Sequence, residues 1–176
     1  MKTKNPHQLK RLTVSALLAA LICLGTLIVI NYSPAGGYIH LGDCFVLLSG
    51  FLMGPLWGGL AAGLGAALTD LILGYAAYIP ATFLIKWGVA AAAWTLMKLL
   101  MSRSQRAAIA KYALSGIVGE CVMVGGYFAY ECMLYGFAGA FPNIFMNAIQ
   151  AASGIIVASL LILPITKIKY LRNFWI

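Results

Sequence analysis

Apolar residues occur in long runs along the chain, and short polar or glycine-rich breaks separate them. A membrane-spanning helix needs about 20 mostly apolar residues, and fewer where it packs inside a bundle. The runs predict six spans, at residues 12–31, 43–54, 56–74, 80–101, 108–134 and 142–166. The second span is short because it ends at Gly54-Pro55, and proline cannot continue a helix without losing a backbone hydrogen bond. We therefore predict an all-α integral membrane protein, a six-helix transmembrane bundle that forms one domain over residues 1–176.

The positively charged residues lie at the ends of these apolar runs. Eleven of the twelve lysines and arginines fall in three groups, at residues 2–11, 98–111 and 167–172. Lys and Arg are enriched on the cytoplasmic side of a membrane, so both termini and the break at 102–107 are predicted to be cytoplasmic. Three connections then face outward, at residues 32–42, 75–79 and 135–141.

Composition supports the membrane class and limits the possible partners. Of the 176 residues, 62% are hydrophobic and only 9% are charged, which leaves too little polar surface for a soluble domain. The formal net charge of +8 could attract nucleic acid, but membrane topology already explains the cations, so we expect a lipid bilayer and no nucleic acid. The four cysteines show neither CxxC nor Cys/His spacing, so no metal site and no bound cofactor are expected.

Five ionisable residues fall inside the predicted spans or at their edges: Asp43, Asp70, Lys86, Glu120 and Glu131. The first two and the last two are all the acids of the chain. Each such group costs at least about 2.5–3.5 kcal/mol to place in a membrane. We therefore expect these residues to pair with one another, to line a water-filled cavity, or to contact a polar ligand.

Most of the polar residues within the spans lie toward their outer ends, and only Glu120 lies near the middle of the membrane. Asn143, Asn147 and Gln150 share one face of the last predicted helix, because they are spaced by four and three residues. Tyr127 continues the stripe that begins at Glu120. The sequence thus predicts a polar region in the outer half of the bundle.

Aromatic residues and one histidine come from the outward connections. Tyr38 and Tyr78 are either interfacial anchors or parts of a lid whose rings stack on a flat heterocycle. For His40, a solvated position is the more common interpretation and a ligand contact is the alternative. Two interpretations of Lys86 also stay open: a structural ion pair with Asp70 or Asp43, or an ammonium group that faces a ligand.

The run GYIHLGDCFVLLSGFLMGPLWGGLAAGLGAALTDLILGYAAYIPATFLIK, at residues 37–86, resembles the substrate-binding S components of energy-coupling factor (ECF) vitamin transporters. The likeness is to the pyridoxine and hydroxymethylpyrimidine group, and the segments GYFAYE and NAIQ extend it over most of the chain. LGD at 41–43, TFLIK at 82–86, GYFAYE at 126–131 and NAIQ at 147–150 match family patterns. The candidate substrate-binding residues are Tyr38, His40, Asp43, Asp70, Tyr78, Thr82, Lys86, Glu120, Tyr127, Glu131, Asn143, Asn147 and Gln150.

The resemblance implies a subunit of a prokaryotic plasma membrane that binds one vitamin from outside. Vitamin B6 is the expected substrate, and hydroxymethylpyrimidine, a thiamine precursor, or another small vitamin is the alternative. The implied partners are a transmembrane coupling subunit and two cytoplasmic ATPases. An AxxxA motif on the first helix docks the coupling subunit in this family, and here Ala16 and Ala20 match it. The loop at 32–42 corresponds to the family's gate.

Two other classes of function compete with this interpretation. No GxxxxGK[ST] motif is present, so the chain is not expected to hydrolyse ATP itself. A self-sufficient ion-coupled transporter could relay protons through Asp70, Lys86 and Glu120, but carriers of that kind often contain inverted repeats, which this chain does not show. A membrane enzyme would need a nucleophile–base pair or a metal cluster, and neither is recognisable, so the chain is expected not to be an enzyme.

Overall fold

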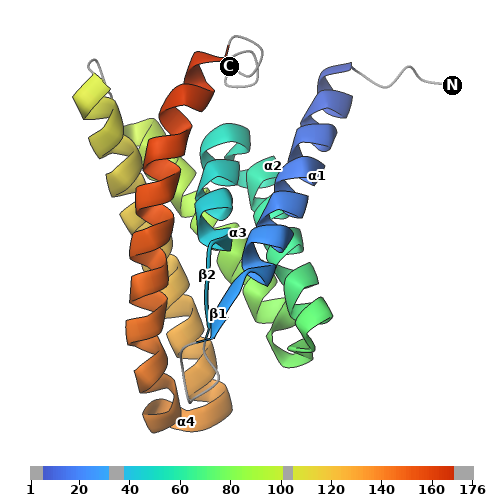
Figure 1. Ribbon diagram of the computed structural model, residues 1–176, viewed down its shortest axis with the longest axis vertical. Helices are drawn as coiled ribbons and strands as arrows, with labels where there is room; N and C mark the ends of the chain where they lie inside the picture. Colours follow the sequence, from blue (N-terminus) through green and yellow to red (C-terminus); the bar gives the residue numbers. More distant parts are fainter. Residues whose placement is uncertain (1–5, 32–37, 101–104, 169–176) are drawn as a thin grey trace, which may run out of the picture.

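The computed structural model describes residues 6–31, 38–100 and 105–168, and within them the chain is a bundle of long helices (Figure 1). Four of the described helices are long and apolar enough to cross a membrane. They are α1 (Pro6–Leu27), α2 (Gly42–Leu73), α3 (Ile79–Leu99) and α4 (Gln105–Lys167). A 3-10 helix, η1 (Ala76–Tyr78), joins α2 to α3. Between α1 and α2, β1 (Val29–Asn31) pairs with β2 (Tyr38–His40) in antiparallel register.

Helices α2 and α4 each change direction at a single glycine. Gly54 has φ 78° and ψ −174°, and Gly136 has φ 74° and ψ 170°, a combination that essentially only glycine adopts. In α2 the change is a reversal, because Ser49 Oγ donates a hydrogen bond of 2.9 Å to the carbonyl oxygen of Gly58. Nine residues of straight helix would separate these groups by about 13 Å. Helix α4 likewise returns along itself, as two neighbouring limbs (Figure 1).

The limbs correspond to four of the predicted spans. Helix α2 divides into limbs at residues 42–53 and 55–73, and α4 divides into limbs at 105–135 and 137–167. The expected outward loop at 135–141 is wrong, because all of these residues except Gly136 have helical geometry. A single residue in the positive-φ region is enough to turn the chain, so no long loop is needed.

The end of the first predicted span is also wrong. Helix α1 ends at Leu27, and residues 29–31 form a strand instead of the last turn of a helix. Ile28, Val29 and Ile30 are all β-branched, which favours a strand as readily as a helix, and their hydropathy is the same in both. The all-α prediction therefore holds for the spans but missed this hairpin. Residues 32–37 of the expected gate lie outside the described residues.

The two ends of the bundle differ in charge. Arg11, Lys98, Lys111 and Lys167 lie where α1 and α4 begin and where α3 and α4 end, and we call this the basic end. The turn at Gly136 and the α2–α3 connection lie at the opposite end, which we call the distal end (Figure 1). The structure thus gathers cations from separate segments at one end, as the sequence predicted.

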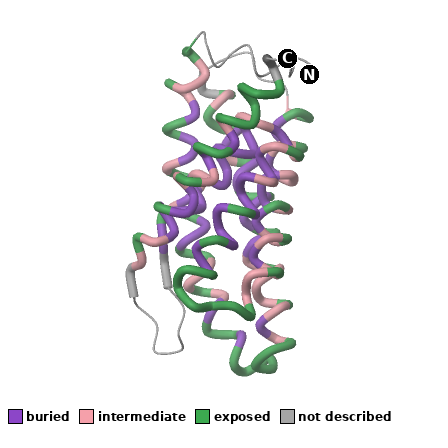
Figure 2. The backbone as a smooth tube through the Cα atoms, turned by 90° about the vertical axis from the view of Figure 1, so that its right-hand side faces the viewer, coloured by how far each residue is buried: buried purple, intermediate pink, exposed green. Residues whose placement is uncertain are grey.

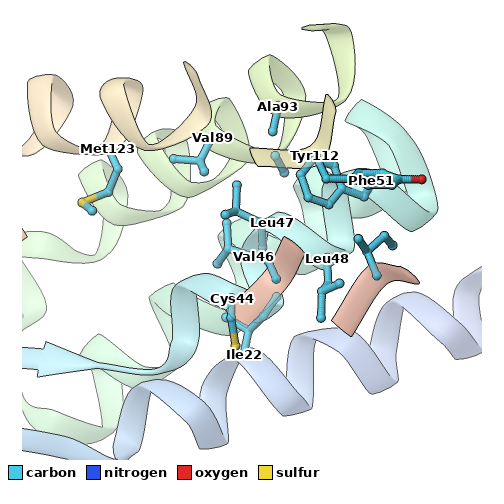
Figure 3. Packing of buried hydrophobic residues seen from close by; sticks show 14 of the residues in the cluster. Ile22, Cys44, Val46, Leu47, Leu48, Phe51, Val89, Ala93, Tyr112 and Met123 are labelled. Carbon is cyan, nitrogen blue, oxygen red and sulfur yellow. The ribbon is translucent and has the colours of Figure 1, made fainter. Parts of the chain in front are cut away.

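The apolar core surrounds the first limb of α2. Figure 3 shows Ile22 of α1, Leu47 of α2, Val89 of α3 and Met123 of α4 in one cluster, and each of them is fully buried. Buried positions run through the interior of the bundle, whereas the outward faces of the helices are mostly exposed (Figure 2). Gly50 allows α2 to approach α3, because a Cβ there would lie 2.5 Å from the carbonyl oxygen of Ala90.

Candidate functional site

A buried ion pair lies at the start of α2. Lys86 Nζ, from α3, donates a hydrogen bond to Asp43 Oδ1, and the two side chains are 2% and 1% exposed. No other salt bridge joins two of the described residues. A lone charge at this depth would be strongly destabilising, so each residue requires the other. Of the two acids that the sequence offered to Lys86, the structure selects Asp43 and not Asp70.

Gln150 extends this pair to the second limb of α4. Its Nε2 donates a hydrogen bond of 2.6 Å to Asp43 Oδ2, and its Oε1 accepts one of 3.3 Å from the backbone N–H of His40. Gly154, one turn further on, makes this approach possible, because a Cβ there would lie 3.1 Å from Asp43 Cβ. Gln150 therefore ties strand β2 to the ion pair.

His40 is buried at the end of β2, so the expectation of a solvated side chain is wrong. It is 6% exposed, and its Nδ1 accepts a hydrogen bond of 3.1 Å from the N–H of Gly42. Burial lowers the pKa of His40 to about 4, although the negative charge of Asp43 opposes this shift, and the charge of Lys86 lowers the pKa further. His40 is thus neutral near pH 7 and acts as an acceptor that shapes the β2–α2 turn.

We expect the free energy of unfolding to decrease as the pH falls from 6.5 toward 4. The folded pKa of His40, about 4, lies below its ordinary value of 6.5, so the unfolded chain binds more protons than the folded chain in this window. Each pH unit then costs up to about 1.4 kcal/mol. Thermal melting in detergent should show this loss, and His40→Gln, which cannot titrate, should lack it. Parallel melting curves for the two proteins would contradict the prediction.

The other side of Lys86 faces the first limb of α4. Its Nζ lies 5.4 Å from the centre of the Tyr127 ring, a cation–π distance. The Tyr127 hydroxyl donates a hydrogen bond of 3.1 Å to Thr82 Oγ1, one turn before Lys86 on α3. An ammonium group has three N–H donors, and Asp43 occupies one of them in this arrangement. Lys86 can therefore keep its ion pair and still donate to a ligand.

Glu120 lies beside this network without joining its hydrogen bonds. It is 2% exposed, and neither of its side-chain oxygens has a hydrogen-bond partner among the described residues. It interacts electrostatically with both Asp43 and Lys86. Buried polar atoms nearly always have a hydrogen-bond partner, so we expect a water molecule or a ligand to bind this carboxyl group. We call His40, Asp43, Thr82, Lys86, Glu120, Tyr127 and Gln150 the polar cluster.

A second polar contact lies toward the distal end. Asn143 Nδ2 donates a hydrogen bond of 3.1 Å to Glu131 Oε2, and both side chains are buried. Asn143 and Gln150 lie on one face of the helix, as predicted, but Asn143 donates to Glu131 whereas Gln150 donates to Asp43. Asn147 lies between them on this face and is partly buried.

Tyrosines surround η1 at the distal end. The Tyr78 ring packs edge-on against Tyr130, with ring centres 5.5 Å apart, and its hydroxyl lies 3.5 Å from that of Tyr135. Tyr130 and Tyr135 were not among the predicted site residues. They follow Tyr127 by three and eight residues near the end of the same predicted span, and this spacing was the signal that could have identified them.

The remaining candidates are Asp70, Tyr38, Ala16 and Ala20. Asp70 interacts electrostatically with Tyr127 of the polar cluster. Asp70 is buried, and its backbone carbonyl oxygen accepts a hydrogen bond of 2.8 Å from the N–H of Tyr75 at the end of α2. The backbone of Tyr38 pairs with Asn31 in the hairpin, and its side chain lies outside the described part. Ala16 and Ala20 are both exposed on one face of α1.

A bundle of long apolar helices with charged residues paired in its interior defines a membrane protein with a buried polar site. Residues 7–167 match the family model described as the S component of ECF-type riboflavin transporters. The chain belongs to this family of vitamin-transport subunits, which bind substrate and are not enzymes.

Individual relatives cover different parts of the chain. The thiamine precursor transporter HmpT of Lactococcus lactis subsp. cremoris (strain MG1363) is 27% identical over 177 aligned residues, which cover 99% of this chain and 98% of that protein. An uncharacterized protein of Pyrococcus woesei is 35% identical over 121 residues, 69% of this chain and 77% of its own length.

The fold has a counterpart among solved structures. The structure described as "Structure and mechanism of the S component of a bacterial ECF transporter" has a TM-score of 0.68 and 23% sequence identity. The match covers 91% of this chain and 97% of that one. At this identity the likeness concerns the fold alone.

Proposed function

We propose that this S component binds a thiamine-precursor pyrimidine of the hydroxymethylpyrimidine type in the polar cluster. The observation that carries the proposal is the buried Glu120 carboxyl group, which has no hydrogen-bond partner among the described residues and lies beside the Lys86–Asp43 pair. A ligand in contact with Glu120 would satisfy a polar group that is otherwise costly to bury.

The chemistry of the cluster fits a flat, hydroxylated nitrogen heterocycle. Lys86 has donors left for a hydroxyl group or a ring nitrogen, and Tyr127 offers an aromatic face. An aminopyrimidine also carries an exocyclic amino group, and its N–H can donate a hydrogen bond to the Glu120 carboxylate. The likeness to a thiamine precursor transporter extends over nearly the whole of both chains, and it favours this substrate over vitamin B6.

The proposed setting is the plasma membrane of a prokaryote, with six membrane crossings and the basic end in the cytoplasm. The cations at that end support this orientation. The gate at 32–42 would face outward, and a coupling subunit with two ATPases would provide ATP-driven release. Because the family consists of ECF subunits, this proposal replaces the self-sufficient ion-coupled transporter in which Asp70 would relay protons.

We expect the purified full chain to bind hydroxymethylpyrimidine more tightly than pyridoxine, riboflavin or thiamine. Isothermal titration calorimetry with each compound measures this order. Glu120→Gln should weaken the binding by about ten- to a hundredfold, because a hydrogen bond to a charged group contributes about 1.5–3 kcal/mol.

Glu131→Gln is the comparison for this experiment, because Asn143 already bonds to that carboxylate, and its effect should be smaller. Tighter binding of pyridoxine or riboflavin would overturn the substrate. An equal effect of the two glutamate substitutions would remove Glu120 from the proposed contact.

A further inference from the structure

The basic end contains a cavity that is separate from the polar cluster. It has a volume of about 330 Å³ and lies where α2 reverses direction at Gly54. The reversal forms one wall, Arg11 of α1 contributes to a second, and Trp94 and Lys98 of α3 contribute to a third. Small-ligand pockets have volumes of about 300–1,000 Å³, so this cavity is large enough for a small polar group.

The charges around the cavity all have the same sign. Arg11 and Lys98 line it, and both side chains are exposed. Lys111 lies close enough to Lys98 for the two ammonium groups to repel each other. The chain has only four acids, and none of them lines this cavity. Cations gathered without an acid among them attract an anion, which would relieve their mutual repulsion.

The aromatic and apolar neighbours indicate where the anion would come from. Trp57 and Trp94 both line the cavity and are partly exposed, and Lys98 Nζ lies 5.8 Å from the centre of the Trp94 ring. Tryptophans of membrane proteins gather at the level of the lipid headgroups. Leu56, which is 60% exposed, provides an apolar surface beside the cations along which an acyl chain can lie.

We propose that this cavity binds the headgroup of an anionic phospholipid, with its phosphodiester near Arg11 and Lys98 and its acyl chains on the apolar surface at Leu56. A free inorganic phosphate would satisfy the cations but would leave that apolar surface without a role. Basic pockets between membrane helices are known to hold anionic headgroups, and the geometry here provides such a pocket.

Native mass spectrometry of the purified full chain tests this proposal. The protein is equilibrated with equal amounts of phosphatidylglycerol and phosphatidylcholine that carry the same acyl chains. We expect the wild-type protein to retain more phosphatidylglycerol. Arg11→Gln and Lys98→Gln should each lower the ratio of retained phosphatidylglycerol to phosphatidylcholine by about fivefold, the loss expected for one cation near an anionic lipid surface.

Lys167→Gln is the matched control, because Lys167 is an exposed cation at the same end that does not line the cavity. It should leave the lipid ratio unchanged. All three variants should bind the vitamin ligand and melt like the wild type, which separates lost lipid selectivity from lost folding.

Three results would overturn the proposal. The first is equal retention of the two lipids by the wild-type protein, and the second is an equal loss of selectivity in Lys167→Gln. The third is complete displacement of phosphatidylglycerol by inorganic phosphate, which would identify a small-anion site instead of a lipid site.

Discussion

Asp43→Asn is expected to lower the free energy of unfolding by about 3–5 kcal/mol, because it leaves the Lys86 ammonium buried without its counter-charge. Gln150 Nε2 also loses a charged acceptor in this variant. Thermal or denaturant unfolding in detergent measures the loss.

The double variant Asp43→Asn/Lys86→Met separates the structural role of the pair from its proposed role in binding. With both charges removed, no buried charge lacks a partner, so much of the stability should return. Ligand binding should not return, because the proposed donor at position 86 is gone. A double variant that binds the ligand like the wild type would show that Lys86 acts only through its ion pair.

Lys86→Met alone should weaken ligand binding by at least about tenfold, as expected for loss of a charged hydrogen bond. Lys98→Met provides the control, because Lys98 lies at the basic end of the same helix and outside the polar cluster. Calorimetry with hydroxymethylpyrimidine compares the two variants. Equal affinities would remove Lys86 from the list of residues proposed to face the ligand.

Leucine at Ala16 and Ala20 is expected to abolish vitamin uptake and leave ligand binding unchanged. Both alanines are exposed on one face of α1, one helical turn apart, so larger side chains there replace no buried packing of the bundle. Small residues at this spacing let a second helix approach closely, and leucine would prevent that approach. The prediction rests on the proposal that this face docks the coupling subunit.

Uptake of labelled ligand by cells that contain the coupling subunit and the ATPases measures transport, and calorimetry on the purified variant measures binding. Ala129→Leu is a matched control, because Ala129 is an exposed alanine on the first limb of α4. Uptake at the wild-type rate in the double leucine variant would place the docking surface elsewhere on the bundle.

The helical segments could be predicted from sequence because hydropathy is a local property. The limbs of α2 and α4 fall close to the predicted spans, and Gly54-Pro55 marks the reversal in α2 as expected. The turn at Gly136 was not predicted, because its neighbours are apolar and helical, and hydropathy does not distinguish a residue with positive φ. The strand at 29–31 was missed for a related reason, since its hydrogen bonds are made with residues 38–40.

All residues of the polar cluster were among the candidates named from the sequence, but the sequence did not indicate which of them contact one another. Burial follows from position within an apolar run, so the sequence alone indicated that Lys86 and Glu120 lie away from water. The choice of Asp43 over Asp70 as the partner of Lys86 depends on how α2 and α3 pack. The hydrogen bond from the backbone N–H of His40 to Gln150 likewise joins residues that are 110 positions apart in the chain.

The sequence by itself determined that this protein is a membrane bundle, where its helices run, and which end collects the cations, because each of these follows from local hydropathy and charge. Only the tertiary structure decided that Lys86 pairs with Asp43 and that the Glu120 carboxyl group has no hydrogen-bond partner among the described residues. It also decided that a cavity lined by cations lies at the reversal of α2 at Gly54. Those features depend on distances between helices, and small residues such as Gly50 and Gly154 set these distances through contacts far apart in the chain.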